Sequence, residues 1–393
     1  MGVLAALGLW AAGANGLPDS AFPRVVVAVV VIAVGGSVDI SGGAGALATT
    51  HGDLTVLPLS VTLAGALVMG AAFLRPLRRR AVAGTRELAG WAARIAVLWA
   101  LALIGLSLAA RQEFAVSTGN GTLNAIGNLL GTSPTVAFRA DVPLSVVIGL
   151  VWLAGLFVLT LLASRSAPLP SRLVPFHESV RPTAHAMVVL LLTYVAGGLV
   201  VGLVVAASRG HTAETFAVLL LGLPNLVWLA FTLGLGVSWE GRVEGPFGLP
   251  MPQILDTVLR HPGNSTVNVR TLAAVDGRAW WLIVVAAVLL LAAAFLSAAR
   301  SPTLVPAWRH AVRFAVALVV TVLAICLLAR VSAHYGLSLL GIGSVGGALS
   351  GEVVLWPHWW TALGFAALWG LVAGFLGALS ARGVRRRGGV ARR

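Results

Sequence analysis

The feature that most constrains this chain is a series of apolar runs, each about twenty residues long, separated by short polar stretches. A helix rises about 1.5 Å per residue, so such a run covers a hydrocarbon core about 30 Å thick. Membrane-spanning strands would instead need about ten residues of alternating polarity. The chain is therefore predicted to be all-α, a polytopic transmembrane helical bundle with about eight to ten hydrophobic segments, forming one integral membrane domain over residues 1–393. The clearest spanning runs are Val56–Leu74, Ala92–Ala110, Leu144–Ala163, His185–Ala207, Trp280–Ala298, Val312–Ala329 and Trp359–Leu379.

Composition supports the same fold class. Of the 393 residues, 58% are hydrophobic and only 10% are charged. A soluble domain carries about 25% charged residues because its surface faces water. A soluble protein built from this sequence would expose large apolar patches and aggregate. The predicted location is therefore the cell membrane, crossed several times, with the lipid bilayer as the first partner.

The arginines predict which side of the membrane each loop faces. All 27 basic residues are arginine, and positively charged short loops stay in the cytoplasm when membrane helices insert. Seventeen arginines fall in four short segments, whereas the other loops are longer and hold seven. The segments predicted to be cytoplasmic are 75–90, 165–183, 300–313 and the basic tail 380–393. The predicted outer loops are 37–55, 111–142, 208–213, 239–278 and 335–358.

The net charge of +14 raises the question of a nucleic-acid partner. The sequence contains no basic soluble domain and no recognition motif, so no nucleic acid is expected. The arginines instead lie in short loops beside apolar runs, where they meet anionic lipid headgroups. The tail around Arg385, Arg386 and Arg387 is dense enough to bind such lipids, and topological anchoring explains it equally well.

No residue pattern predicts an enzyme, a cofactor or a metal site. The single cysteine, Cys326, excludes zinc clusters and iron–sulfur ligation, which need several thiolates. The eight histidines are scattered, and no two of them have metal-ligand spacing within a span. The stretch Gly341–Gly346 spells a dinucleotide fingerprint, but it follows a membrane run and lacks the strand and helix that the fingerprint requires. The predicted sets of catalytic, cofactor-binding and metal-binding residues are therefore empty.

One apolar segment disturbs the predicted topology. Segments 165–183 and 300–313 are both predicted to be cytoplasmic, so an even number of crossings must separate them, yet three apolar segments lie between. The segment that can fail to cross is Thr215–Val237, because Pro224 removes a backbone donor near its centre. Two re-entrant half-helices would restore the parity, provided that protein surrounds the broken backbone. The alternative is an ordinary proline-kinked helix with a mixed charge pattern elsewhere.

The same segment is the first candidate for a functional site. A carbonyl near Leu220 should lack its helical partner, and an unsatisfied carbonyl in lipid costs several kcal/mol, roughly. Asn225 is the nearest side chain able to donate a hydrogen bond. We therefore expect Gly222, Pro224 and Asn225 to face the bundle interior or a wet cavity. In the alternative interpretation, a neighbouring helix satisfies the kink and Asn225 serves only packing.

A second interruption lies near the N-terminus, at Gly35 and Gly36. The apolar stretch Val25–Val34 before it is too short to span a membrane alone. If the first helix runs outward, this piece must dip and return before Val56–Leu74 runs inward. The residues predicted to form a substrate site or a structural break are therefore Gly35, Gly36, Gly222, Pro224 and Asn225.

The outer loop 239–278 contains a predicted amphipathic helix over residues 250–261. Asp256 and Arg260 lie off its apolar stripe and are expected to be wet. The helix is expected to lie flat on the outer membrane interface or on the bundle. The apolar positions at helical spacing are Met251, Ile254, Leu255, Val258 and Leu259, of which Leu255 and Leu259 are expected to be buried.

Several blocks of the sequence resemble one known family. The blocks are Ala33–Val38, Leu57–Val61, Phe73–Arg75, Leu233–Trp239 and Asp276–Trp280. They resemble the streptophobe family, very hydrophobic membrane proteins known mainly from streptomycetes. The resemblance covers nearly the whole chain, and this sequence departs from the family at its N-terminus. It implies a membrane location and no mechanism, since the family has no assigned activity. A fainter likeness to an actinobacterial membrane family linked to cell division rests on His51-Gly52, Leu57–Leu59 and Leu223–Asn225.

Two functions remain open from the sequence. The first is a non-enzymatic membrane scaffold or cell-envelope maintenance protein, which needs no site. The second is a small-molecule transporter that uses broken helices around Gly35-Gly36 and Pro224-Asn225, since such breaks expose backbone to a substrate. An enzyme is not expected, because paired polar catalytic groups are missing from the spans.

Overall fold

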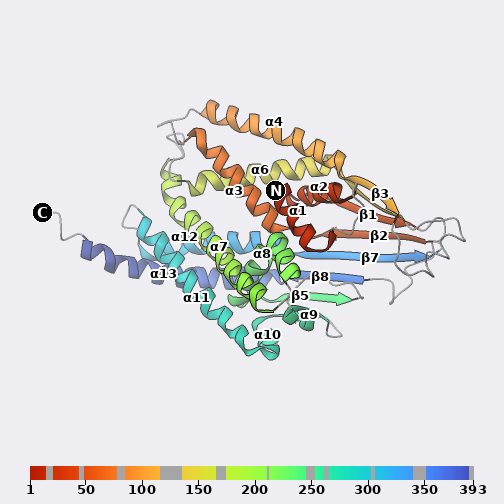
Figure 1. The fold of residues 1–393 in the computed structure, drawn as a ribbon. Helices are drawn as coiled ribbons and strands as arrows, with labels where there is room; N and C mark the ends of the chain where they lie inside the picture. Colours follow the sequence, from red (N-terminus) through yellow and green to blue (C-terminus); the bar gives the residue numbers. More distant parts are fainter. Residues whose placement is uncertain are drawn as a thin grey trace, which may run out of the picture.

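The computed structural model describes residues 1–14, 21–43, 48–77, 85–115, 135–164, 174–209, 212–244, 253–260, 265–301, 306–339 and 351–388. The predicted polytopic helical bundle is confirmed (Figure 1). Its longer helices are α3 (Leu59–Leu77), α4 (Thr85–Ala109), α6 (Val142–Ala163), α7 (Val174–Arg209), α8 (Thr212–Gly234), α11 (Trp281–Arg300), α12 (Ala307–Leu328) and α13 (Trp359–Gly388). Shorter helices are α1 (Gly2–Ala11), α2 (Ala21–Ala33), α9 (Gln253–Leu259), α10 (Val269–Val275) and the 3-10 turn η3 (Gly277–Trp280).

Seven helices are long and apolar enough to cross a membrane: α4, α6, α7, α8, α11, α12 and α13. Six of them contain predicted spanning runs, and α8 contains the segment whose crossing the sequence left open. The predicted run Val56–Leu74 forms α3, which begins only at Leu59, after Pro58. The outward faces of these helices carry large apolar side chains, as a surface in contact with lipid requires. Examples exposed over more than half their area are Val97, Leu98, Val147, Val151, Val158, Val200, Val288, Val320 and Leu368.

A second layer, which the sequence analysis did not predict, is an eight-stranded antiparallel sheet at one end of the bundle (Figure 1). Four pairs of strands supply it, and each pair belongs to the connection between two helices. The sheet order is β3-β4-β1-β2-β7-β8-β5-β6. The strands are β1 (Val38–Gly43), β2 (Ala48–Thr55), β3 (Arg111–Ala115), β4 (Thr135–Ala140), β5 (Trp239–Glu244), β6 (Ser265–Val267), β7 (Val331–Leu339) and β8 (Gly351–Pro357).

The arginine-rich helix ends lie at the end of the bundle opposite the sheet. Every strand lies in or overlaps a loop predicted to be outer, and the C-terminal end of α13 lies at the opposite end of the bundle from the sheet in Figure 1. The helix ends that carry Arg75, Arg86, Arg300 and Arg309 face the same side as that end of α13. The charge asymmetry and the architecture therefore agree on two distinct faces.

This asymmetry yields a prediction of topology. A periplasmic-type reporter fused after Leu379 is expected to be inactive, because the arginine-rich segments 75–90, 165–183 and 300–313, which the fusion keeps, place that end of α13 in the cytoplasm. The same reporter fused after Val267, in the sheet, is expected to be active. Fusion assays in the native membrane measure both positions, and activity after Leu379 would contradict the orientation.

The bundle and the sheet are built from two tandem repeats of the same unit. Residues 2–163 read helix, helix, strand pair, helix, helix, strand pair, helix, and residues 174–388 follow the same order with α9, α10 and η3 added. The sheet preserves the correspondence, because β3-β4-β1-β2 of the first repeat is followed by β7-β8-β5-β6 of the second. Residues at matching places in matching elements thus play equivalent parts in the two repeats, and the number of positions between them changes from element to element because the connections differ in length.

The equivalence extends to single hydrogen bonds. In the turn after α2, Gly35 N–H donates to Ile32 O at 2.8 Å, and after α8 Gly236 N–H donates to Leu233 O at 2.8 Å. Gly35 and Gly236 have φ values of 89° and 95°, the left-handed conformation that closes a helix and favours glycine. Gly236 follows Gly35 by the same number of positions as Leu233 follows Ile32. The two turns therefore occupy equivalent places in the two repeats.

The strand register and the prolines agree with the same alignment. Val38 pairs with Ala140 in the first repeat, and Trp239 pairs with Pro357 in the second. Asp141 N–H donates to Ser37 O, and His358 N–H donates to Ser238 O. The alignment also places Pro23 and Arg24 of α2 on Pro224 and Asn225 of α8.

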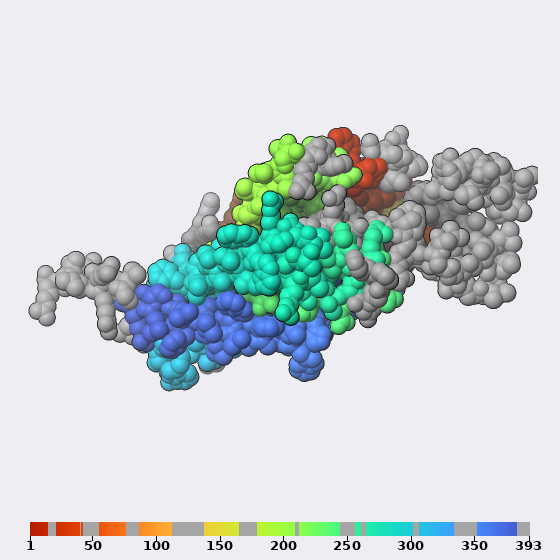
Figure 2. Space-filling model, turned by 90° about the horizontal axis from the view of Figure 1, so that it is seen from below, coloured from red at the N-terminus to blue at the C-terminus, as the bar shows by residue number. Residues whose placement is uncertain are grey.

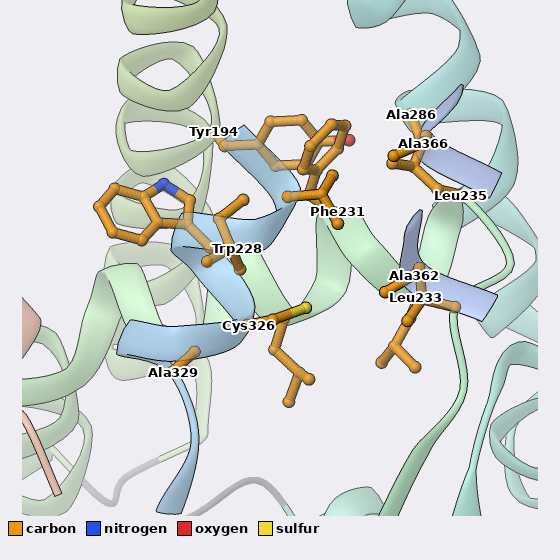
Figure 3. Close-up of a cluster of buried hydrophobic side chains, with 14 of the residues drawn as sticks. Tyr194, Trp228, Phe231, Leu233, Leu235, Ala286, Cys326, Ala329, Ala362 and Ala366 are labelled. Carbon is orange, nitrogen blue, oxygen red and sulfur yellow. The ribbon is translucent and has the colours of Figure 1, made fainter. Parts of the chain in front are cut away.

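The larger apolar core belongs to the second repeat. Figure 3 shows Tyr194 of α7 against Phe231 of α8, with Cys326 of α12 nearby; the two rings lie 5.0 Å apart. Small residues let the helices approach closely here, and Figure 2 shows α11 and α13 side by side on one face. A Cβ added at Gly377 of α13 would lie 2.7 Å from the carbonyl carbon of Ala294 in α11.

Candidate functional site

The predicted pair of half-helices in Thr215–Val237 is wrong, because α8 is one continuous helix from Thr212 to Gly234 with Pro224 inside it. The structure gives the physical reason. Leu223 and Pro224 are buried against other helices, so protein rather than lipid surrounds the backbone that proline weakens. The Ser60 hydroxyl of α3 also accepts a hydrogen bond from Leu223 N–H, beside the proline.

The structure resolves the parity problem in a different way. Residues 219–225 of α8 contact the first turn of α3, at the sheet end of that helix. A Cβ added at Gly234 would lie 2.5 Å from Leu282 O in the first turn of α11, also at the sheet end. The stretch from Leu219 to Gly234 therefore lies across the sheet end of the bundle and does not pass from one face to the other.

Helix α2 lies across the sheet end in the same manner. Arg24 donates to the carbonyl oxygen of Arg111 at the start of β3, and the Thr62 hydroxyl of α3 donates to Ala33 O at 2.6 Å. Both contacts are at sheet-side helix ends. Both ends of α2 therefore lie on the sheet side, and the helix enters β1 directly through the turn at Gly35; that Val25–Gly36 dips into the membrane stays a prediction.

Asn225 joins the two repeats. Its side-chain oxygen accepts a hydrogen bond from Leu59 N–H at 3.2 Å, and its side-chain nitrogen donates to Leu57 O at 2.9 Å. Leu59 is the first residue of α3, where backbone N–H groups have no partner within the helix. Asn225 thus caps a helix of the other repeat, 166 residues away in the sequence.

Ser60 makes the complementary contact from α3 to α8. Its hydroxyl donates to Leu219 O at 2.9 Å and accepts from Leu223 N–H at 3.1 Å. These two backbone groups are i and i+4 neighbours in α8, next to the proline. The predicted role of Asn225 as partner of a carbonyl near Leu220 is therefore not the observed one: Ser60 serves the backbone beside Pro224, and Asn225 bonds to α3. We call Leu57, Leu59, Ser60, Leu219, Leu223 and Asn225 the inter-repeat junction.

The other predicted site residues surround this junction. Gly222 lies beside Asn225, whose Oδ1 is the nearest atom to an added Cβ, at 4.0 Å. Gly35 and Gly36 form the turn after α2, and a Cβ at Gly36 would lie 2.7 Å from Ser145 Oγ. Since Thr62 holds Ala33 and Ser60 holds α8, the first two turns of α3 bring both predicted breaks onto one helix end.

The junction is suited to holding the repeats together rather than to catalysis. Its amide and hydroxyl groups are occupied by backbone partners, and it contains no ionisable side chain. Across the described part of the chain, no group of three His, Cys, Asp or Glu residues could hold a metal ion. Metal-assisted chemistry therefore has no candidate site among those residues.

The amphipathic helix of the 239–278 loop lies near this end as α9, shorter than predicted. Leu259 is buried and Leu255 half-buried, whereas Arg260 is exposed; the side chain of Asp256 lies outside the described residues. Leu259 packs on Gly241 of β5, so the apolar stripe covers the sheet. Whether its other side touches lipid headgroups stays a prediction.

Sequence reasoning missed Ser60. The serine stands in the block Leu57–Val61, and a lone serine after a proline carries no signal of its long-range partner. Pro224 and Asn225 were visible because proline within an apolar run breaks a local rule. No known protein family, curated protein or solved structure matches this chain.

Proposed function

We propose that this integral membrane protein is a non-enzymatic scaffold of the cell envelope, in which the helical bundle holds an outer sheet in a fixed position. The observation that carries the proposal is the sheet itself. Its strands run directly into helices of the bundle at α2, α4, α6, α8, α12 and α13, and the β2–β7 pairing joins the two repeats over Ala48–Thr55. A sheet attached to the helices at so many points is suited to presenting a surface in a fixed position.

The inter-repeat junction supports the same function. Asn225 and Ser60 fix α8 against α3 with four hydrogen bonds, each to the backbone. Such bonds make one arrangement of the repeats preferable to others, because moving α8 would leave these part-buried polar groups unpaired. The basic face opposite the sheet would bind anionic lipid headgroups, and membership of the streptophobe family is part of the proposal.

A second candidate is a small-molecule transporter. The observation that favours it is the tandem repeat, since secondary transporters place their substrate sites at the interface between repeats and move one repeat against the other. The residues of such a site would be Asn225 and Ser60. This candidate requires the junction to open, whereas the scaffold requires it to stay closed.

Locking the repeats distinguishes the two functions. Asp53 of β2 and His334 of β7 are direct partners in the strand pairing, and cysteines at paired positions have the spacing of a disulfide. We expect the oxidised Asp53→Cys/His334→Cys protein, in a Cys326→Ala background, to restore a deletion strain as well as the unlocked protein does. Loss of that activity on oxidation, with recovery on reduction, would refute the scaffold and favour transport.

A further inference from the structure

The two outer strands of the sheet are the repeat equivalents of the two strands that pair at its centre. Among the described strands, β3 and β6 have a partner on one side only. By the repeat alignment, β6 corresponds to β2 and β3 corresponds to β7, and β2 pairs with β7. The outer edge of β3 is therefore equivalent to the β7 edge that pairs with β2, and the outer edge of β6 is equivalent to the β2 edge that pairs with β7. We call this β2–β7 pairing between the repeats the internal joint.

The membrane limits which edges can meet. Two copies must keep the same orientation, and β3 leaves the bundle after α4 while β6 leads back toward it through α10. Antiparallel pairing of β3 with a second β3 would invert one copy in the membrane. Pairing of β6 with β3 of another copy is antiparallel and keeps both copies upright, as the β2–β7 joint does for the two repeats.

The internal joint predicts the register between copies. Asp53 pairs with His334, and Leu54 pairs with Ala333. In the repeat alignment Asp53 corresponds to Thr266 and His334 to Ala115, because Asp39–Asp53 matches Glu240–Thr266 and the β3–β4 pairing matches the β7–β8 pairing. Thr266 should therefore lie opposite Ala115 of the next copy, and Val267 opposite Phe114.

The β6 edge can accept such a partner. Thr266 is exposed, and its carbonyl oxygen accepts a hydrogen bond from the Thr271 hydroxyl of α10 at 2.9 Å. A carbonyl oxygen has two lone pairs, so this bond leaves capacity for one more donor. The helices would meet as the repeats do: α6 contacts α7 within the chain, and the equivalent contact joins α13 of one copy to α1 of the next. Apolar side chains exposed on those helices include Val3, Leu7, Trp10, Leu368, Leu371 and Phe375.

We propose that copies of this chain associate head to tail in the membrane, with β6 of one copy extending its sheet onto β3 of the next. The contact uses different surfaces on its two sides, so it closes into a ring when the rotation per copy permits and otherwise continues as a row. The partner is a second copy of this chain. This inference rests on the fold and not on the proposed scaffold function.

Cysteine cross-linking in native membranes tests the register. In a Cys326→Ala background, the Ala115→Cys/Thr266→Cys double variant is expected to form a ladder of covalent multimers on mild oxidation, and neither single variant should do so. The matched control is Asp53→Cys/His334→Cys, which bridges the equivalent positions within one chain and should give an oxidised monomer. The unmodified protein in lipid nanodiscs should have the mass of two or more chains.

Two results would overturn the proposal. The first is a double variant that stays monomeric under conditions that oxidise the intrachain control. The second is dimer formation by the Ala115→Cys variant alone, because that would place two β3 edges side by side. Since the scaffold proposal is tested by complementation with the intrachain lock, failure of one proposal leaves the other intact.

Discussion

Replacing Asn225 with leucine is expected to lower the free energy of unfolding by about 2–4 kcal/mol. The change leaves Leu59 N–H and Leu57 O without their side-chain partner, and each unsatisfied buried group costs about 1–3 kcal/mol. Hydrogen bonds between side chains in membrane proteins average only about 0.6 kcal/mol. The larger value is expected here because one side chain serves two backbone groups. Thermal unfolding of the purified protein in detergent measures the loss.

Two further variants show whether the loss of stability in Asn225→Leu comes from its two hydrogen bonds. Thr193 of α7 donates only to Val189 O of its own helix, so Thr193→Val should change the stability by less than about 0.5 kcal/mol. Pro224→Ala should also be mild, because α8 is already continuous through Pro224. If Asn225→Leu is as stable as Thr193→Val, Asn225 serves only packing and the junction does not hold the repeats together.

Replacing Gly370 with alanine is expected to destabilise the bundle by about 1–3 kcal/mol, the usual cost of overpacking a dense core. An added Cβ at Gly370 of α13 would overlap the Cα atom of Ala315 in α12, and backbone cannot move aside as a flexible side chain can. The helices would have to separate along the contact that Phe314 and Gly374 also make. Thermal unfolding in detergent again measures the effect.

Gly364 provides the matched control on the same helix. A Cβ at Gly364 meets no atom within 4 Å, so Gly364→Ala adds only the helix preference of alanine and should be neutral or slightly stabilising. Equal effects at the two positions would show that α12 and α13 are not packed as closely as the structure has them.

The helical bundle could be predicted because each spanning helix is recognisable from its own residues. Runs such as Leu144–Ala163 and Trp280–Ala298 needed no knowledge of their neighbours, since length and apolarity alone decide whether a helix can cross lipid. The arginine distribution was equally local. Neither the apolar runs nor the arginine distribution depends on how the helices pack against one another.

The sheet and the junction could not be predicted in this way. The strands have three to nine residues each and pair with strands far away in the sequence, as β2 does with β7. The role of Ser60 depends on α8, more than 150 positions later, since the hydroxyl meets Leu219 O at a separation of 159 residues. The half-helix prediction was wrong for the same reason. Proline usually interrupts a helix, but protein packed around Pro224 lets α8 continue through it.

The β2–β7 joint also sets the order in which the protein can be completed during synthesis. A ribosome produces β1, β2, β3 and β4 early, and these strands can pair among themselves as soon as they emerge on the outer face. The free side of β2 then has to wait until α12 has been inserted, because only the strand after that helix can cover it. During this interval the nascent chain exposes an unpaired strand edge, the kind of surface at which chains pair wrongly with one another. Maturation of this membrane protein is therefore governed by the arrival of its last third.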